Sequence, residues 1–122
     1  MAATPPFRGG RNIALKIPPH QFDDLVRFYG EVLGLPRLGE FEPSVVFEFG
    51  TSRLWLDRVA GMSQPELWLE VETDDSRTAA RHLKAQDVVR CDDIEVLPDG
   101  FDGFWVSAPG GIIHLVAGPK SG

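Results

Sequence analysis

The sequence has a single cysteine, Cys91, and no long hydrophobic run. One cysteine cannot form an intramolecular disulfide, which fits a reducing compartment such as the cytoplasm. No uninterrupted apolar segment approaches the roughly 18 to 20 residues that a membrane-spanning helix needs. The first eleven residues contain proline and glycine but no apolar core, so they do not resemble a secretory signal. We therefore expect a cytoplasmic protein that does not enter a membrane.

Basic residues are also scarce. The chain has 12 Lys and Arg against 18 Asp and Glu, which gives a net charge of -6. This balance provides no general attraction for nucleic acid phosphates or for anionic membrane surfaces. The length of 122 residues, with 43% hydrophobic and 25% charged residues, fits one globular domain. The partner classes that remain are a small molecule and another protein, and the acidic charge favours a neutral or cationic ligand.

The first half of the chain predicts one strand, one helix and three more strands. Residues 12–17 alternate between apolar and polar positions, which is typical of a strand with one apolar face. Apolar residues recur at helical spacing over 22–33, and Gly34 and Pro36 end that helix. The three further strands are predicted at 37–41, 44–49 and 54–58.

The second half repeats this order. In the strand predicted at 66–71, Leu67, Leu69 and Val71 share one face, and Glu66, Trp68 and Glu70 share the other. A helix is predicted at 75–86, capped by Thr73, Asp74 or Asp75. Extended segments follow at 88–97, 104–107 and 112–116. The sequence thus predicts a flexible tail at 1–10 and one α+β domain at 11–119, made of modules 11–60 and 65–119 with the order βαβββ.

Three segments resemble the vicinal oxygen chelate superfamily, which contains glyoxalase I, extradiol dioxygenases and bleomycin-binding proteins. They are Arg27-Phe28-Tyr29 with Val32-Leu33-Gly34-Leu35, Leu69-Glu70-Val71 with Asp74, and Ala108 to Leu115. The resemblance implies two βαβββ modules in a curled, mostly antiparallel, half-open barrel. It also implies that the chain forms a homodimer and holds its ligand in the cup of the barrel.

The resemblance further implies four metal-ligand positions, which fall on Asn12, Trp55, Glu66 and His114. The match at His114 assumes that the turn at Pro109 is one residue shorter than in the family. Glutamate and histidine are good metal ligands, asparagine offers a neutral carbonyl oxygen, and tryptophan offers nothing. Because a catalytic divalent metal takes about three protein ligands, we expect either no cofactor or one divalent metal ion (Zn, Ni, Mn or Fe).

Two functions compete at these positions. The first is a binding protein of the glyoxalase and bleomycin-resistance type, which holds a small molecule in the cup without a complete metal site. Its predicted ligand-binding residues are Asn12, Lys16, Trp55, Trp68 and His114. The second is a metal-dependent lyase, isomerase or transferase that acts on a substrate with adjacent oxygens. In that enzyme Glu66 is the catalytic residue, and Glu66 and His114 bind the metal.

Each candidate also has a structural interpretation. The tryptophans could be ordinary core residues, and Lys16 could pair with Glu70 rather than meet an anionic ligand. His114 alternates with Ile113 and Leu115, which we expect to face the core, so its side chain should face the cup. Cys91 precedes two aspartates, whose charges should raise the thiol pKa and make the thiol unreactive.

Overall fold

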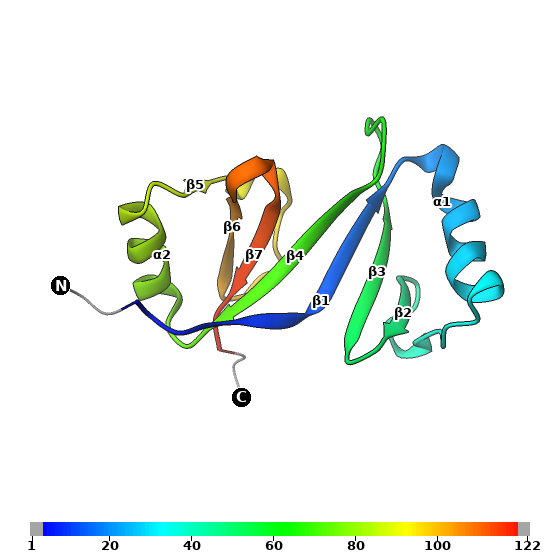
Figure 1. Cartoon of the computed structure of the whole chain (residues 1–122), viewed down its shortest axis with the longest axis horizontal. Helices are drawn as coiled ribbons and strands as arrows, with labels where there is room; N and C mark the ends of the chain where they lie inside the picture. The colour runs from blue at the N-terminus through cyan, green and yellow to red at the C-terminus, as the bar shows by residue number, and fades with distance from the viewer. Residues whose placement is uncertain (1–3, 120–122) are drawn as a thin grey trace. The chain divides into compact units, whose positions relative to one another are not determined.

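The computed structural model describes residues 4–119 and contains two α-helices and seven strands in that range. The chain divides into two compact units, each with its own strands and helix (Figure 1). Residues 11–68 form the N-terminal unit, and residues 69–119 with residues 4–10 form the C-terminal unit. These elements confirm the α+β class. Their bounds are β1 (Phe7–Ile17), α1 (Pro19–Arg27), β2 (Val45–Phe49), β3 (Ser52–Arg58), β4 (Glu66–Thr73), α2 (Ser76–Ala85), β5 (Val89–Arg90), β6 (Gly103–Ser107) and β7 (Ile113–Ala117).

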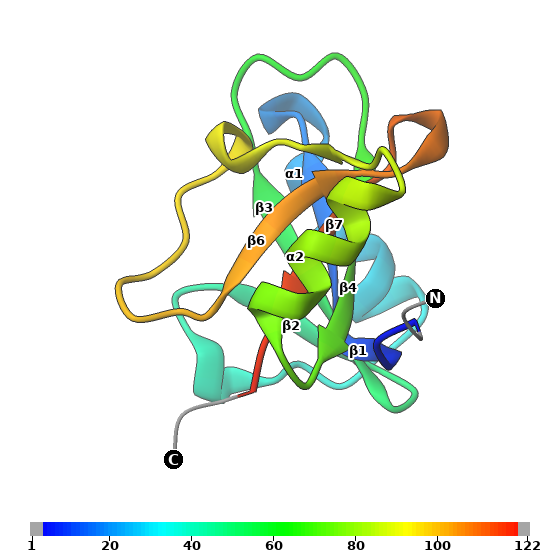
Figure 2. The same cartoon turned by 90° about the vertical axis from the view of Figure 1, so that its left-hand side faces the viewer.

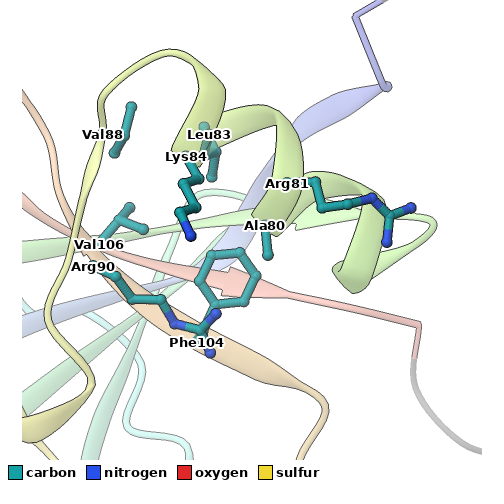
Figure 3. A pocket seen from close by; sticks show the side chains of 8 residues that line it. All are labelled: Ala80, Arg81, Leu83, Lys84, Val88, Arg90, Phe104 and Val106. Atoms are coloured by element: carbon teal, nitrogen blue, oxygen red, sulfur yellow. The ribbon is translucent and has the colours of Figure 1, made fainter.

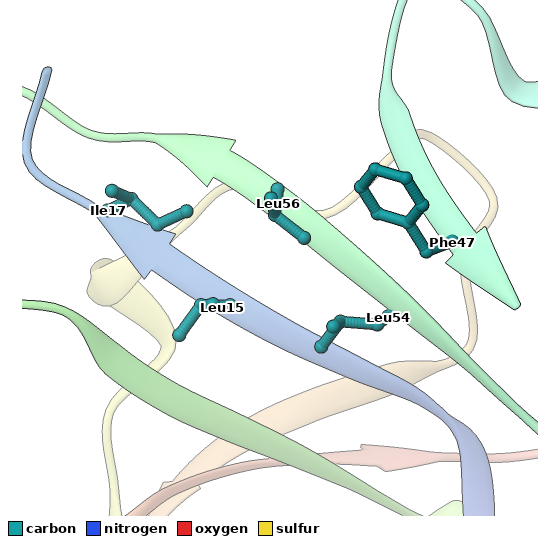
Figure 4. Packing of buried hydrophobic residues seen from close by; sticks show 5 residues of the cluster. All are labelled: Leu15, Ile17, Phe47, Leu54 and Leu56. Atoms are coloured by element: carbon teal, nitrogen blue, oxygen red, sulfur yellow. The ribbon is translucent and has the colours of Figure 1, made fainter. Parts of the chain in front are cut away.

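The strands of the N-terminal unit lie in the order β2-β3-β1. β1 and β3 are parallel, with α1 in the connection between them, and β2 is antiparallel to β3. The alternation predicted from the sequence puts apolar side chains on one face of these strands, where they form a buried cluster (Figure 4). Helix α1 covers this face. The buried residues are Leu15, Ile17, Phe47, Leu54 and Leu56.

The predicted helix at 22–33 is present but starts earlier and changes form. Pro19 occupies its first turn, where a missing N–H costs nothing. From Phe28 to Val32 the helix widens into a π-helix, closed by a 2.9 Å hydrogen bond from Leu33 N to Phe28 O. The prolines that end the preceding strand therefore also begin the helix.

The strand predicted at 37–41 is wrong. Only Arg37 forms a bridge, to Phe47, and Gly39–Phe41 turn as a 3-10 helix. The segment does follow β2 briefly, because Leu38 N donates to Val46 O at 2.9 Å. The 3-10 turn then carries the backbone out of strand geometry, which leaves this unit with three strands of its own and a short part of β4.

The strands of the C-terminal unit lie in the order β4-β7-β6-β5. β4 and β7 are parallel. β6 is antiparallel to both of its neighbours, β7 and β5. Helix α2 begins at the predicted cap, since Asp75 accepts hydrogen bonds from the backbone of Arg77 and Thr78. It packs over β6 and β7 (Figure 2). The buried cluster beneath it consists of Ala79, Phe104, Val106 and Val116.

Two further expectations differ from the structure. The extended stretch at 88–97 contains only the two-residue β5, after which Asp92–Ile94 turn as a 3-10 helix. β1 begins at Phe7, so residues 7–10, expected in the tail, are strand. Phe7 packs against the α2 cluster, and Arg8 pairs with Asp74 at 3.0 Å. These contacts hold that segment against the C-terminal unit.

Candidate functional site

A polar and aromatic face lies on the N-terminal unit, opposite the face that α1 covers. In the β1–β3 register, Ala14 is the partner of Trp55 and Lys16 is the partner of Asp57. Opposed residues in a pair of strands point to the same side of the sheet. Because Leu54 and Leu56 point into the core, their neighbours on β3 face the other way. We call this surface the aromatic face; it consists of Asn12, Lys16, Phe41, Arg53, Trp55, Asp57, Glu66 and Trp68.

Lys16 is the most buried charged residue of this face, with 2% of its surface exposed. Its Nζ lies 2.8 Å from Asp57 Oδ2. The same Nζ lies 4.4 Å from the centre of the Trp68 ring. A buried ammonium group requires compensation of this kind, and tryptophan is the best aromatic partner for a cation. The charge of Lys16 is therefore compensated within the protein, and Asp57 is one of its partners.

Trp55 is held by Asn12. The indole Nε1 donates to Asn12 Oδ1 at 2.8 Å, and the ring remains half-exposed. One neighbour is Phe41, whose ring centre is 5.0 Å from that of Trp55. The guanidinium of Arg53 lies over the Phe41 ring at 5.0 Å. These contacts build a cluster of Arg53, Phe41 and Trp55, in which the two aromatic rings are tilted by 54° to each other.

Glu66 bonds in the same way to the second tryptophan of the face. The indole Nε1 of Trp68 donates to Glu66 Oε1 at 3.2 Å. Trp68 is buried, whereas Glu66 is exposed. Leu67, which alternates with these two residues, has 55% of its surface exposed. Leu69, next on the same side, has 38% exposed, so the apolar face predicted for β4 is covered only near Val71.

His114 lies in the C-terminal unit, and its side chain is on the opposite face of β7 from the one predicted. The register pairs His114 with Val106 and pairs Val116 with Phe104. These partners belong to the cluster under α2, so His114 is on the helix-covered face of β7, and its Nδ1 lies 3.1 Å from Ile112 O. Both faces of β7 are apolar, and for this reason alternation alone could not choose between them. Leu115 occupies the opposite face.

The four predicted metal positions do not fit a divalent ion. Trp55 has no ligand atom. Asn12 Oδ1 and Glu66 Oε1 each accept an indole hydrogen bond, and His114 lies on the face that α2 covers. Within residues 4–119, no group of three or more His, Cys, Asp or Glu side chains is placed to hold a metal ion.

The site residues predicted from the sequence did not include three members of the aromatic face. Asp57 and Arg53 follow the same two-residue period as Trp55, so that period could have identified both. Phe41 comes from a segment predicted as a strand, and only the 3-10 turn brings its ring to Trp55. The pKa of the Cys91 thiol is raised, first by burial and then by the charge of Asp92. The sequence predicted the direction and the effect of Asp92, but not the larger effect of burial.

Comparison with known structures shows the fold of the vicinal oxygen chelate superfamily. Methylmalonyl-CoA epimerase from Mycobacterium tuberculosis matches with a TM-score of 0.63 at 15% identity, covering 99% of this chain and 94% of that one. A glyoxalase/bleomycin resistance protein/dioxygenase superfamily member from Vibrio splendidus matches with a TM-score of 0.58 at 12% identity, covering 88% and 97%. The Mn(II)-bound glyoxalase from Novosphingobium aromaticivorans matches with a TM-score of 0.60 at 20% identity, covering 92% of this chain and 40% of that one.

These matches establish the fold, as the resemblance implied. Searches of the sequence against protein-family models and against curated proteins find no match. Across residues 4–119, neither α-helix has the length and apolar character needed to cross a membrane.

Proposed function

We propose that this protein binds a small planar molecule, neutral or cationic, on its aromatic face and without a metal ion. The observation that carries the proposal is the 2.8 Å hydrogen bond from Trp55 to Asn12, which fixes a half-exposed indole beside Phe41. An aromatic ring that is already fixed loses little conformational entropy when a ligand stacks on it. Ligand sites typically combine such rings with a few oriented polar groups.

The net charge of the chain supports a neutral or cationic ligand. The Lys16 ammonium is compensated by Asp57 and by the Trp68 ring. Glu66 places a carboxylate at the same face, and the whole chain carries a net charge of -6. An anionic ligand would therefore meet a compensated Lys16 and an unfavourable overall field, with Arg53, over the Phe41 ring, as the other cation of the face.

A metal-dependent reaction is the other function predicted from the sequence, and one solved structure of this fold is a Mn(II)-bound glyoxalase. The donor atoms at the family positions do not fit such an ion in this chain. We therefore propose ligand binding rather than a glyoxalase-type lyase, isomerase or transferase reaction. In this proposal Glu66 accepts a hydrogen bond from Trp68 and does not bind a metal ion.

Isothermal titration calorimetry with three bicyclic aromatic probes of similar size tests this proposal. The probes are 2-naphthol, which is neutral, N-methylquinolinium, which is cationic, and 2-naphthoate, which is anionic. We expect saturable binding of the first two and weaker binding of the third. Trp55→Leu, which keeps an apolar side chain but removes the ring, should abolish this binding.

Trp105→Phe is the matched control. Trp105 lies in the C-terminal unit and is buried, with its indole donating to Glu95 O at 3.0 Å. Its replacement should leave probe binding unchanged. Equal loss of binding in both variants would contradict a site at Trp55. Elemental analysis of protein purified without chelators gives the second readout: a stoichiometric divalent metal that Glu66→Ala removes would favour the metal-dependent enzyme.

We also propose that the chain is a homodimer, because two-fold dimers are the commonest closed assemblies. Light scattering should then give twice the chain mass of 13.5 kDa. A mass of one chain at working concentration would contradict this assembly. The cytoplasmic location stays a prediction from the sequence.

A further inference from the structure

A second surface with the character of a ligand site lies entirely within the C-terminal unit, between α2 and strands β5 and β6. It is a cavity of about 460 Å³ (Figure 3). Ligand cavities in proteins typically measure about 300 to 1,000 Å³, so a small molecule fits. The lining residues are Ala80, Arg81, Leu83, Lys84, Val88, Arg90, Phe104 and Val106.

The uncharged part of this lining is entirely apolar. Phe104 and Val106 come from β6, where both are buried, and Leu83 comes from α2. Ala80 contributes only a methyl group to the lining. Such a surface accepts a hydrocarbon or aromatic body and gains free energy by removing it from water.

The charged part of the lining is entirely cationic, which contrasts with the net charge of -6 for the whole chain. In Figure 3, Lys84 extends from α2 towards the Phe104 ring, while the Arg81 guanidinium points away from that ring. A cation in the last turn of a helix also stabilises the helix dipole, which accounts in part for Lys84. Arg90 comes from β5, and its ion pair with Asp92 accounts in part for its presence.

Arg90 is held in place and still has donors to offer. Its guanidinium lies over the Phe104 ring at 4.5 Å. Its Nε donates to Asp92 Oδ2 at 2.6 Å. Among the described residues, no further hydrogen bond involves its two terminal nitrogens, which are suited to a carboxylate.

We propose that this cavity binds an amphipathic monocarboxylate, with its carboxylate between Lys84 and Arg90 and its apolar body against Phe104 and Val106. The site is separate from the aromatic face and prefers the opposite ligand charge. It therefore extends the proposed function and does not depend on it.

Titration of the ¹⁵N-labelled full chain with sodium octanoate, followed by NMR, tests the proposal. We expect saturable shifts of the backbone amides of residues 80–90 and 103–107. Octan-1-ol has the same chain without the charge and should bind at least about tenfold more weakly, since the charge-assisted hydrogen bonds are lost. Octyltrimethylammonium should not bind there.

Three variants separate charge from shape. Lys84→Glu reverses a lining charge and should weaken octanoate binding by roughly tenfold. Arg77→Glu makes the same charge change on the same helix outside the lining, and should leave binding unchanged. Ala80→Leu adds a side chain that suits a helix but fills the cavity, and should abolish binding.

Three results would contradict the proposed carboxylate site. Equal binding of octanoate and octan-1-ol, or equal weakening by Lys84→Glu and Arg77→Glu, would overturn the carboxylate site. Octanoate shifts confined to residues outside α2, β5 and β6 would do the same. Because Trp55→Leu lies in the other unit, it should leave octanoate binding intact, so failure of one proposed site is distinguishable from failure of the other.

Discussion

The hydrogen bond between Asn12 and Trp55 has a free energy that a double-mutant cycle can measure. Asn12→Ala removes the acceptor, and Trp55→Phe removes the donor while keeping an aromatic ring. The two atoms are 2.8 Å apart and partly buried. A protein hydrogen bond contributes about 0.5 to 1.5 kcal/mol net, so we expect a coupling free energy of about 1 kcal/mol. The cycle is needed because each residue also makes other contacts, which it cancels.

The single variants should show a related asymmetry. Asn12→Ala leaves a partly buried indole N–H without its acceptor, which costs about 1 to 3 kcal/mol. Asn12→Asp keeps an acceptor oxygen and should retain most of the stability. Urea unfolding followed by far-ultraviolet circular dichroism gives the free energy of unfolding of each variant without relying on tryptophan fluorescence.

A coupling free energy within about 0.3 kcal/mol of zero would refute the reasoning, because it would mean that the two side chains act independently. A result near 1 kcal/mol with no loss of 2-naphthol binding in Asn12→Ala would have a different meaning. It would confirm the bond but show that fixing the indole is unnecessary for recognition.

Three further predictions concern stability and reactivity. Phe47→Ala removes the largest buried side chain of the N-terminal core and should lower the free energy of unfolding by about 3 to 5 kcal/mol, measured by urea unfolding. Hydrogen bonds from Thr78 and Arg77 hold the pKa of the Asp75 carboxyl below its unfolded value, so its stabilisation is present above about pH 4 and is lost as the pH falls through the folded pKa. Asp75→Asn should flatten this pH dependence in thermal melts. Burial and Asp92 raise the pKa of Cys91, so iodoacetamide at pH 7 should alkylate it more slowly than an unstructured cysteine peptide; equal rates would contradict this.

Periodicity predicted the elements whose two faces differ strongly. In β1 and β3 one face is apolar and the other polar, so the orientations of Lys16 and Trp55 followed directly from the sequence. In β7 both faces are apolar, and the orientation of His114 depends on its register with β6, which one sequence does not reveal. Local pattern is informative only where the two sides of a strand meet different surroundings.

The loop at Gly39–Phe41 and the cavity beside α2 could not be predicted from the sequence, because both depend on tertiary packing. The 3-10 turn at Gly39–Phe41 places Phe41 beside Trp55, and nothing in its local pattern distinguishes it from a short strand. The cavity under α2 combines Lys84 with Arg90, which belong to different elements. Their proximity depends on the packing of α2 against β6, a tertiary property.

Residues on β3 alternate strictly between the two faces of the sheet, so the strand has two sets of positions that differ in how well they tolerate substitution. Leu54 and Leu56 are buried in the core, and varying them risks the fold. Arg53 and Trp55 lie on the other side, where a substitution costs about 1 to 3 kcal/mol, against a typical total stability of about 5 to 15 kcal/mol. Asp57 also lies on that side, but its replacement would remove a carboxylate partner of the buried Lys16 ammonium, so it belongs with the positions to be kept. A library randomised only at Arg53 and Trp55 should yield mostly folded proteins with altered ligand preference. One short strand thus gives selection a surface on which new specificities can arise without rebuilding the interior.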